Sequence, residues 1–111
     1  KRNYVHIKDV ADCFSFAMNN FTNLKGEAYN FGLDDANYSK EELANIIKKE
    51  VPDFMAVYSD IGEDPDKRNY VVSNQKLKEK GFSAVRSVHE GVKELIKAYK
   101  MIPEWDLTRN A

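Results

Sequence analysis

Two matching helix-start signals constrain the fold of this chain more than any other feature. Ser39 is followed three residues later by Glu42, and Ser87 is followed in the same way by Glu90. This is the spacing of a capping box, in which the hydroxyl accepts from a first-turn N–H and the carboxylate reaches back to the N–H of the cap. Apolar residues recur at helical spacing after each box, and a proline follows each stretch. The sequence therefore predicts two well-defined amphipathic helices.

Further helices and three strands complete the predicted organisation. Asp9 is the expected N-cap of the first helix, Ser73 caps a short third helix, and Gly81 ends that helix in a left-handed conformation. The four helices are expected at 9–20, 39–51, 75–80 and 87–102. Short runs rich in β-branched and aromatic residues predict strands at Asn3–Ile7, Ala28–Phe31 and Phe54–Ser59. Because strands alternate with helices, we predict an α/β segment with parallel strands and about four helices.

Composition excludes several classes of function. The chain has 111 residues, of which 42% are apolar and 32% charged, which suits one small domain with a hydrophobic core. Its net charge is −1 and no basic stripe is present, so we expect no nucleic-acid partner. The apolar runs are shorter than the ~20 residues that span a bilayer, so we expect no membrane partner. Cys13 is the single cysteine and cannot form an internal disulfide, which favours a cytoplasmic location.

A series of short phrases in a fixed order carries the strongest functional signal. They are Arg2-Asn3-Tyr4-Val5-His6-Ile7-Lys8-Asp9-Val10-Ala11, Tyr29-Asn30-Phe31-Gly32, Asp66-Lys67-Arg68-Asn69-Tyr70-Val71-Val72-Ser73, Gly81-Phe82 and Gly91. Together they resemble the C-terminal part of the NAD-dependent epimerases and dehydratases of nucleotide sugars, in the extended short-chain dehydrogenase/reductase superfamily. The resemblance implies a substrate-binding part over residues 1–102, the substrate side of that fold, followed by a tail over 103–111.

The resemblance also implies which residues bind and which chemistry lies elsewhere. Arg2 corresponds to an arginine that contacts the substrate diphosphate, and Arg68 and Tyr70 correspond to residues on its phosphate and nucleotide side. The family's Gly-rich cofactor turn and catalytic helix lie upstream of the matching region. We therefore expect NAD(P) and a nucleotide-diphosphate sugar in an intact enzyme, and no catalytic residue, bound cofactor, metal or turnover in this segment alone. Glu63 stands where many members have an arginine, a departure that puts one phosphate contact in doubt.

Three other patterns have simpler explanations. Tyr4 and Lys8 match a Tyr-x-x-x-Lys spacing, but that chemistry needs one helical turn between them and the stretch is predicted as a strand. His6 is expected to be a hydrogen-bonded structural group. The acidic residues Asp60, Glu63, Asp64 and Asp66 lack EF-hand spacing and are expected to form a solvated loop.

A second class of function remains open, a stand-alone, non-catalytic module that binds a partner or assembles with itself. In the family, the strand near Tyr29–Phe31 pairs with a sheet that this sequence does not contain. The helix carrying Phe14, Ala17 and Phe21 would then present an apolar face beside an open strand edge. Such surfaces promote association, so we expect a homo-oligomer. The resemblance also leaves open whether the reaction is an epimerisation or a dehydration.

Overall fold

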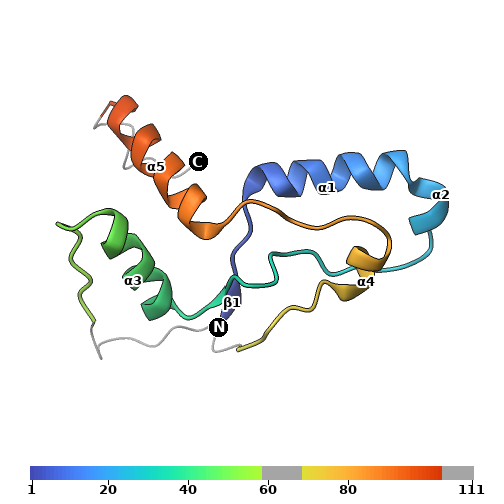
Figure 1. Ribbon diagram of the computed structural model, residues 1–111, viewed down its shortest axis with the longest axis horizontal. Coiled ribbons are helices and arrows are strands. Elements are labelled where there is room, and N and C mark those ends of the chain that lie inside the picture. Colours follow the sequence, from blue (N-terminus) through green and yellow to red (C-terminus); the bar gives the residue numbers. More distant parts are fainter. Residues whose placement is uncertain (59–68, 104–111) are drawn as a thin grey trace.

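The structure is a computed structural model that describes residues 1–58 and 69–103, and these residues are mainly helical (Figure 1). In chain order the elements are β1 (Arg2–Asn3), α1 (Ile7–Asn19), α2 (Phe21–Leu24), β2 (Asn37–Tyr38), α3 (Lys40–Glu50), α4 (Gln75–Glu79) and α5 (Val88–Met101). Helices α3 and α5 stand at one end of the long axis and α2 and α4 at the other, with β1 near the middle. The N-terminal segment therefore connects the two ends of the molecule.

The predicted α/β class with parallel strands is wrong, because the described part of the chain is α-rich. Its sheet is a single antiparallel pair, with Arg2 opposite Tyr38 and Asn3 opposite Asn37. Residues 28–31 and 54–58 are not strands, and Ser59 lies outside the described residues. A strand is stabilised by its hydrogen-bonded neighbour rather than by local propensity alone. In segment 28–31 the Tyr29 ring instead contacts Lys76 of α4 and the Phe31 ring contacts Phe82, so its apolar sequence misled the assignment.

The two capping boxes are confirmed. The Ser39 hydroxyl accepts from the Glu42 N–H at 3.1 Å, and the Glu42 carboxylate accepts from the Ser39 N–H at 2.7 Å. Ser87 and Glu90 repeat the arrangement at 3.2 and 2.7 Å. In each box the glutamate carboxylate accepts a hydrogen bond from the serine backbone N–H. This bond lowers the pKa of that glutamate below its usual value.

The starts of two other helices differ from the prediction. Helix α1 begins at Ile7 with His6 as its N-cap, because the His6 ring nitrogen Nδ1 accepts from the Lys8 N–H at 3.0 Å, and Asp9 lies inside the helix. Helix α4 is preceded by Asn74 rather than capped by Ser73. Its predicted end is confirmed, since Gly81 has a φ of 101°. Sequence patterns therefore located these helices better than they identified their caps.

Apolar contacts form two groups, one near each end of the molecule. Helix α3 packs against α5, and Ile46 of α3 and Val92 of α5 are each 8% exposed. Near α4, the Phe82 ring lies 5.2 Å from the ring of Phe16 on α1 and 5.7 Å from that of Phe31. The buried apolar residues of the described chain are Leu24, Ala36, Ile46, Leu77 and Val92. Each contributes at most about 1.5–3 kcal/mol, so this core is small and polar interactions must help to hold the two ends together.

The capping boxes make the stability of this fold sensitive to acid. The folded-state pKa values of Glu42 and Glu90 lie below 4.5, so their contribution is present above that pH and is lost as the pH falls through the folded-state values. We expect the free energy of unfolding, measured with urea, to fall between neutral pH and about pH 3. The double variant Glu42→Gln/Glu90→Gln should show a smaller fall. The exposed neighbour Glu41→Gln is the control, and an equal fall in all three proteins would contradict this assignment.

Candidate functional site

Two asparagine side chains fix the segment that carries Arg2. The Asn3 amide donates to the Leu33 carbonyl at 2.7 Å and to the Asn37 side-chain oxygen at 3.1 Å, and its own oxygen accepts from the Leu33 N–H at 3.0 Å. A Cβ atom at Gly32 would overlap the Asn3 amide, so only glycine allows this approach. The Asn3 side chain thus holds the loop before β2 against β1.

The segment that carries Tyr70 lies beside the same strand. The Val72 N–H donates to the Asn37 side-chain oxygen at 3.1 Å, and the Tyr70 N–H donates to the Lys1 carbonyl at 3.5 Å. The Lys1 backbone nitrogen also donates to the Asn69 side-chain oxygen. Residues from two distant parts of the sequence are therefore brought together at β1.

Arg2 and Tyr70, two of the three predicted substrate-binding residues, are in contact. The guanidinium carbon of Arg2 lies 5.1 Å from the centroid of the Tyr70 ring, within cation–π range. One Arg2 nitrogen also donates to the Lys1 carbonyl at 3.3 Å. Tyr70 is 46% exposed, so its ring remains accessible on one side. Arg68, the third residue, lies outside the described residues, and substrate binding by all three stays a prediction.

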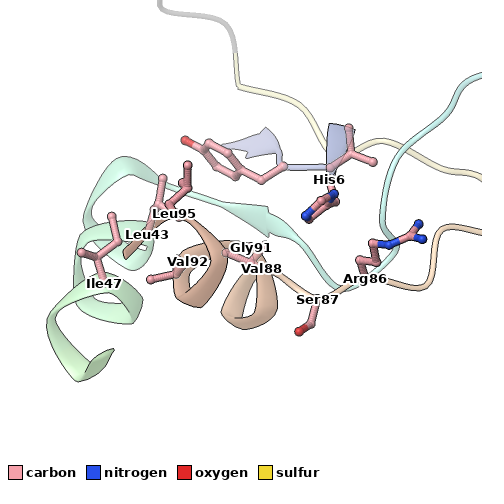
Figure 2. Close-up of a pocket in the computed structure, with 11 residues that line it drawn as sticks. His6, Leu43, Ile47, Arg86, Ser87, Val88, Gly91, Val92 and Leu95 are labelled. Atoms are coloured by element: carbon pink, nitrogen blue, oxygen red, sulfur yellow. The ribbon is translucent and has the colours of Figure 1, made fainter. Parts of the chain in front are cut away.

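A cavity of about 210 Å³ lies next to this region, between the β1–α1 connection and helices α3 and α5 (Figure 2). Leu43 and Ile47 of α3 and Val92 and Leu95 of α5 make one side of it apolar. Its volume is below the roughly 300–1,000 Å³ of typical small-molecule sites. We therefore assign the cavity to incomplete packing between α5 and the N-terminal segment, and not to substrate binding.

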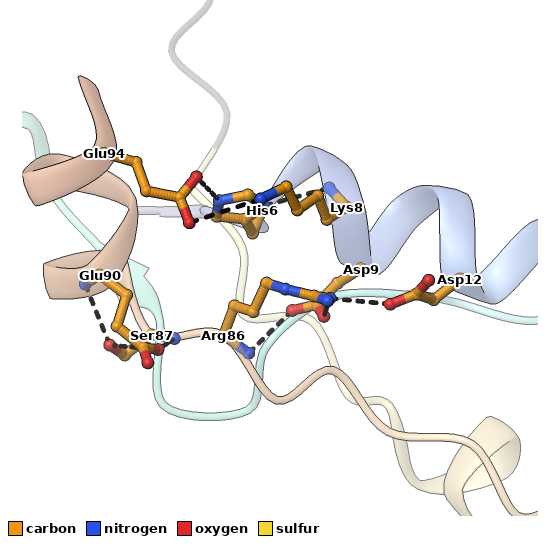
Figure 3. Close-up of polar contacts among 8 residues, drawn as sticks. All are labelled: His6, Lys8, Asp9, Asp12, Arg86, Ser87, Glu90 and Glu94. Carbon is orange, nitrogen blue, oxygen red and sulfur yellow. Dashed lines mark hydrogen bonds and ion pairs between the residues drawn. The ribbon is translucent and has the colours of Figure 1, made fainter. Parts of the chain in front are cut away.

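His6 borders this cavity in the structural role that the sequence predicts. Its Nδ1 accepts from the Lys8 N–H, and its Nε2 lies 3.0 Å from a carboxylate oxygen of Glu94 on α5 (Figure 3). Because Nδ1 is an acceptor in this geometry, Nε2 is the nitrogen that carries the proton and donates it to Glu94. This hydrogen bond lowers the pKa of Glu94. His6 thus joins the start of α1 to α5.

Asp9 is the most deeply buried charged group in the described part of the chain, with 1% exposure. One of its oxygens accepts from the backbone N–H groups of Val85 and Arg86 at 3.2 and 2.9 Å, and the other accepts from the Arg86 side chain at 2.6 Å. The same Arg86 nitrogen donates to Asp12 at 2.7 Å, as Figure 3 shows. The carboxylates of Asp12 and Asp9 raise the pKa of the Arg86 guanidinium. We call Asp9, Asp12 and Arg86 the α1 clamp.

Sequence reasoning missed both the asparagine contacts and the α1 clamp. The sequence predicts Asp9 as a local N-cap, whereas its partner Arg86 lies 77 residues away. Asn37 lies in a stretch where the sequence predicts neither a helix nor a strand. The rejected Tyr4 and Lys8 pair does not form a helical turn, since Tyr4 precedes α1 and Lys8 lies in its first turn. The strand predicted over Asn3–Ile7, on which that rejection was based, is nevertheless wrong, because β1 ends at Asn3.

A metal site and a membrane-spanning helix are both absent from residues 1–58 and 69–103. No cluster of three or more histidine, cysteine or acidic side chains there has the arrangement of a metal site. The acidic residues 60–66 lie outside this part of the chain. In the same described residues, none of the helices combines the length and the apolar character that crossing a bilayer requires.

Comparison with known proteins supports the resemblance at a coarse level. No protein-family model matches the sequence. The chain is 30% identical over 114 aligned residues to the trifunctional UDP-glucose 4,6-dehydratase/UDP-4-keto-6-deoxy-D-glucose 3,5-epimerase/UDP-4-keto-L-rhamnose-reductase of Arabidopsis thaliana. The match covers 94% of this chain and spans 15% of the plant protein. The chain is thus a distant relative of a nucleotide-sugar dehydratase and epimerase.

The α1 clamp predicts an asymmetry between two neighbouring acidic residues. Asp9→Ala should lower the free energy of unfolding by about 3 kcal/mol, because it leaves the backbone N–H groups of Val85 and Arg86 without their acceptor and the partly buried Arg86 guanidinium with Asp12 alone. Asp12→Ala removes the carboxylate that is 56% exposed and should have little effect. Urea unfolding of both variants measures the difference. Similar losses in the two variants would contradict the clamp as described.

Proposed function

We propose that this chain is the C-terminal substrate-binding portion of a nucleotide-sugar epimerase or dehydratase. In this proposal it contacts the diphosphate and the nucleoside of the substrate, and the catalytic groups belong to another part of a longer enzyme. The observation that carries the proposal is the contact between Arg2 and Tyr70. These residues belong to two separate phrases of the family resemblance, and the distant plant relative is named for reactions on UDP-sugars.

The chemistry of the pair suits a nucleotide diphosphate. An arginine side chain offers a planar fork of N–H donors that matches phosphate oxygens and stays charged at any physiological pH. An aromatic ring can stack on a nucleobase or hold the guanidinium in position through a cation–π contact, which is worth roughly 0.5–1 kcal/mol at exposed sites. The asparagine contacts of Asn3 and Asn37 fix the backbone beneath both side chains. A partly ordered pair loses less entropy on binding.

The proposed enzyme would use NAD(P), but the described residues do not fit that cofactor. A dinucleotide pyrophosphate is held by a Gly-rich turn between a strand and a helix, where helix N–H groups point at the phosphates. Within the described part of the chain no glycine occupies such a position: Gly26 and Gly81 follow helices, Gly91 lies inside α5 and Gly32 precedes β2. We therefore limit the role of this chain to binding and orienting the sugar nucleotide.

A titration of the 111-residue chain with UDP-glucose, followed by two-dimensional NMR, tests the binding role. We expect saturable shifts at Arg2, Asn69 and Tyr70. Arg2→Ala should weaken binding by about tenfold or more, because a charge-assisted contact to phosphate is worth roughly 1.5–3 kcal/mol. Tyr70→Leu should weaken it by removing the ring, whereas Tyr70→Phe keeps the ring and reports on the hydroxyl alone.

Two controls separate this site from general charge effects. Lys97→Ala removes a positive charge from an exposed position of α5 and should leave the affinity unchanged. Glucose without the nucleotide should not bind. Equal affinity of the wild type and Arg2→Ala, or no binding of UDP-glucose at millimolar concentrations, would contradict the proposal.

Calorimetric titration with NAD and NADH gives a separate expectation. Because the described residues lack a phosphate-binding turn, the chain should show no heat of binding with either cofactor and no turnover of UDP-glucose. Micromolar binding of NAD to the 111-residue chain would show that the cofactor site lies within this sequence after all.

A further inference from the structure

One asparagine side chain lies between the two segments of the candidate site. The Asn37 side-chain oxygen accepts from the Asn3 amide and from the Val72 N–H, each at 3.1 Å. Asn3 directly follows Arg2 in β1, and Val72 lies just after Tyr70. A carbonyl oxygen has two lone pairs, so both hydrogen bonds can form at once. Two segments that lie far apart in the sequence therefore share one acceptor.

The amide of Asn37 has one orientation that satisfies its neighbours. Its nitrogen donates to the Asp34 carbonyl at 3.2 Å, while its oxygen faces the two donors. A flipped amide would place its N–H groups against those of Asn3 and Val72, and its oxygen against a carbonyl oxygen. Asn37 is also the residue of β2 that pairs with Asn3 in the antiparallel register. Backbone and side chain together hold the shared acceptor in place.

The Tyr70 side of the site depends on this acceptor. A second contact of the same segment, from the Tyr70 N–H to the Lys1 carbonyl, is 3.5 Å long, whereas such bonds are usually about 2.9 Å. Tyr70 is 46% exposed, so burial does little to hold its ring against Arg2. The shorter and partly buried bond from Val72 to Asn37 is therefore the better anchor for the ring.

We propose that Asn37 is the positioning residue of the candidate site, whose side-chain oxygen sets the contact between Arg2 and Tyr70 and so the affinity for a nucleotide diphosphate. The effect on affinity rests on the proposed function, whereas the contact itself is present without a ligand. Without Asn37, Asn3 keeps two hydrogen bonds to Leu33, but the Tyr70 segment loses its anchor. Groups that are held in position before the ligand arrives lose less entropy on binding.

NMR spectra of the 111-residue chain without ligand test the contact. The ring current of Tyr70 shifts the side-chain protons of Arg2 upfield, because the guanidinium lies over the ring. Asn37→Ala should move these signals toward their positions in Tyr70→Leu, which has no ring. Asn37→Asp keeps an oxygen that accepts from both donors and should retain the upfield shift. Its added negative charge would repel a diphosphate, so this variant serves for the ligand-free spectra only.

Two further variants complete the ligand-free experiment. Asn20→Ala is the matched control, because it removes an amide that donates to the Phe16 carbonyl at 2.9 Å at the end of α1. It should leave the Arg2 signals in place. Asn37→Ser has a hydroxyl too short to reach both donors, so it should behave like Asn37→Ala and replaces that variant if the alanine protein does not fold. Circular dichroism and urea unfolding establish that each variant is folded.

Titrations with UDP-glucose test the consequence for binding. Asn37→Ala should weaken the affinity by about threefold to tenfold, since the loss of one hydrogen bond changes an equilibrium by roughly that factor. In a Tyr70→Leu background the same substitution should change the affinity by less than about twofold, because the ring that it positions is already gone. A role in general stability would lower the affinity equally in both backgrounds. Asn20→Ala should leave the affinity unchanged.

The outcomes are distinct. An upfield shift that is lost in Asn37→Ala and kept in Asn37→Asp, with a loss of affinity that depends on Tyr70, supports the proposal. A shift that persists in Asn37→Ala, or equal losses of affinity in both backgrounds, would overturn it. If the wild-type chain does not bind UDP-glucose, the proposed function and the effect on affinity are both overturned. The ligand-free spectra then still decide whether Asn37 sets the contact between Arg2 and Tyr70.

Discussion

The buried carboxylate of Asp9 is the constraint on which the arrangement of this chain depends. The few buried apolar residues form separate groups near α4 and between α3 and α5, and neither group fixes how α1 meets the start of α5. Asp9 does so by accepting two backbone N–H groups and the Arg86 side chain. A buried ion pair is not always net stabilising, but the backbone donors make this one specific for position. Helix α1 and the segment before α5 therefore share one fixed geometry.

The candidate site depends on that geometry through the N-terminal segment. This segment runs from Lys1 through β1 to the His6 cap, and the α1 clamp holds its far end. At its near end, the Asn3 amide and the Asn37 side chain join β1 to the loop at 33 and to the Tyr70 segment. Arg2 and Tyr70 meet because both backbones are held. The same clamp turns the inner face of α1 toward the chain and leaves Ile7, Phe14 and Met18 exposed on the other side.

The sequence predicted the parts of the fold that depend on local chemistry. The capping boxes at Ser39 and Ser87 and the left-handed Gly81 are satisfied by residues a few positions away, so a single sequence suffices to find them. Strands were predicted at 28–31 and 54–59, but residues 28–31 and 54–58 are not strands, because a strand requires a partner that local composition does not reveal. The partnership of Asp9 and Arg86 spans 77 residues and left no local signal. Arg2 and Tyr70 were identified by family resemblance and not by any pattern in the residues themselves.

In the proposed site Arg2 and Tyr70 act as one unit on a nucleotide diphosphate, and a double-mutant cycle tests this coupling most directly. UDP-glucose affinity would be measured for the wild-type chain, Arg2→Ala, Tyr70→Leu and the double variant. If the ring positions the guanidinium, the double variant should lose less binding free energy than the two single variants lose together. The difference, which is the coupling between the two residues, should be about 0.5 kcal/mol or more. Strictly additive losses, or no loss in either single variant, would contradict the account.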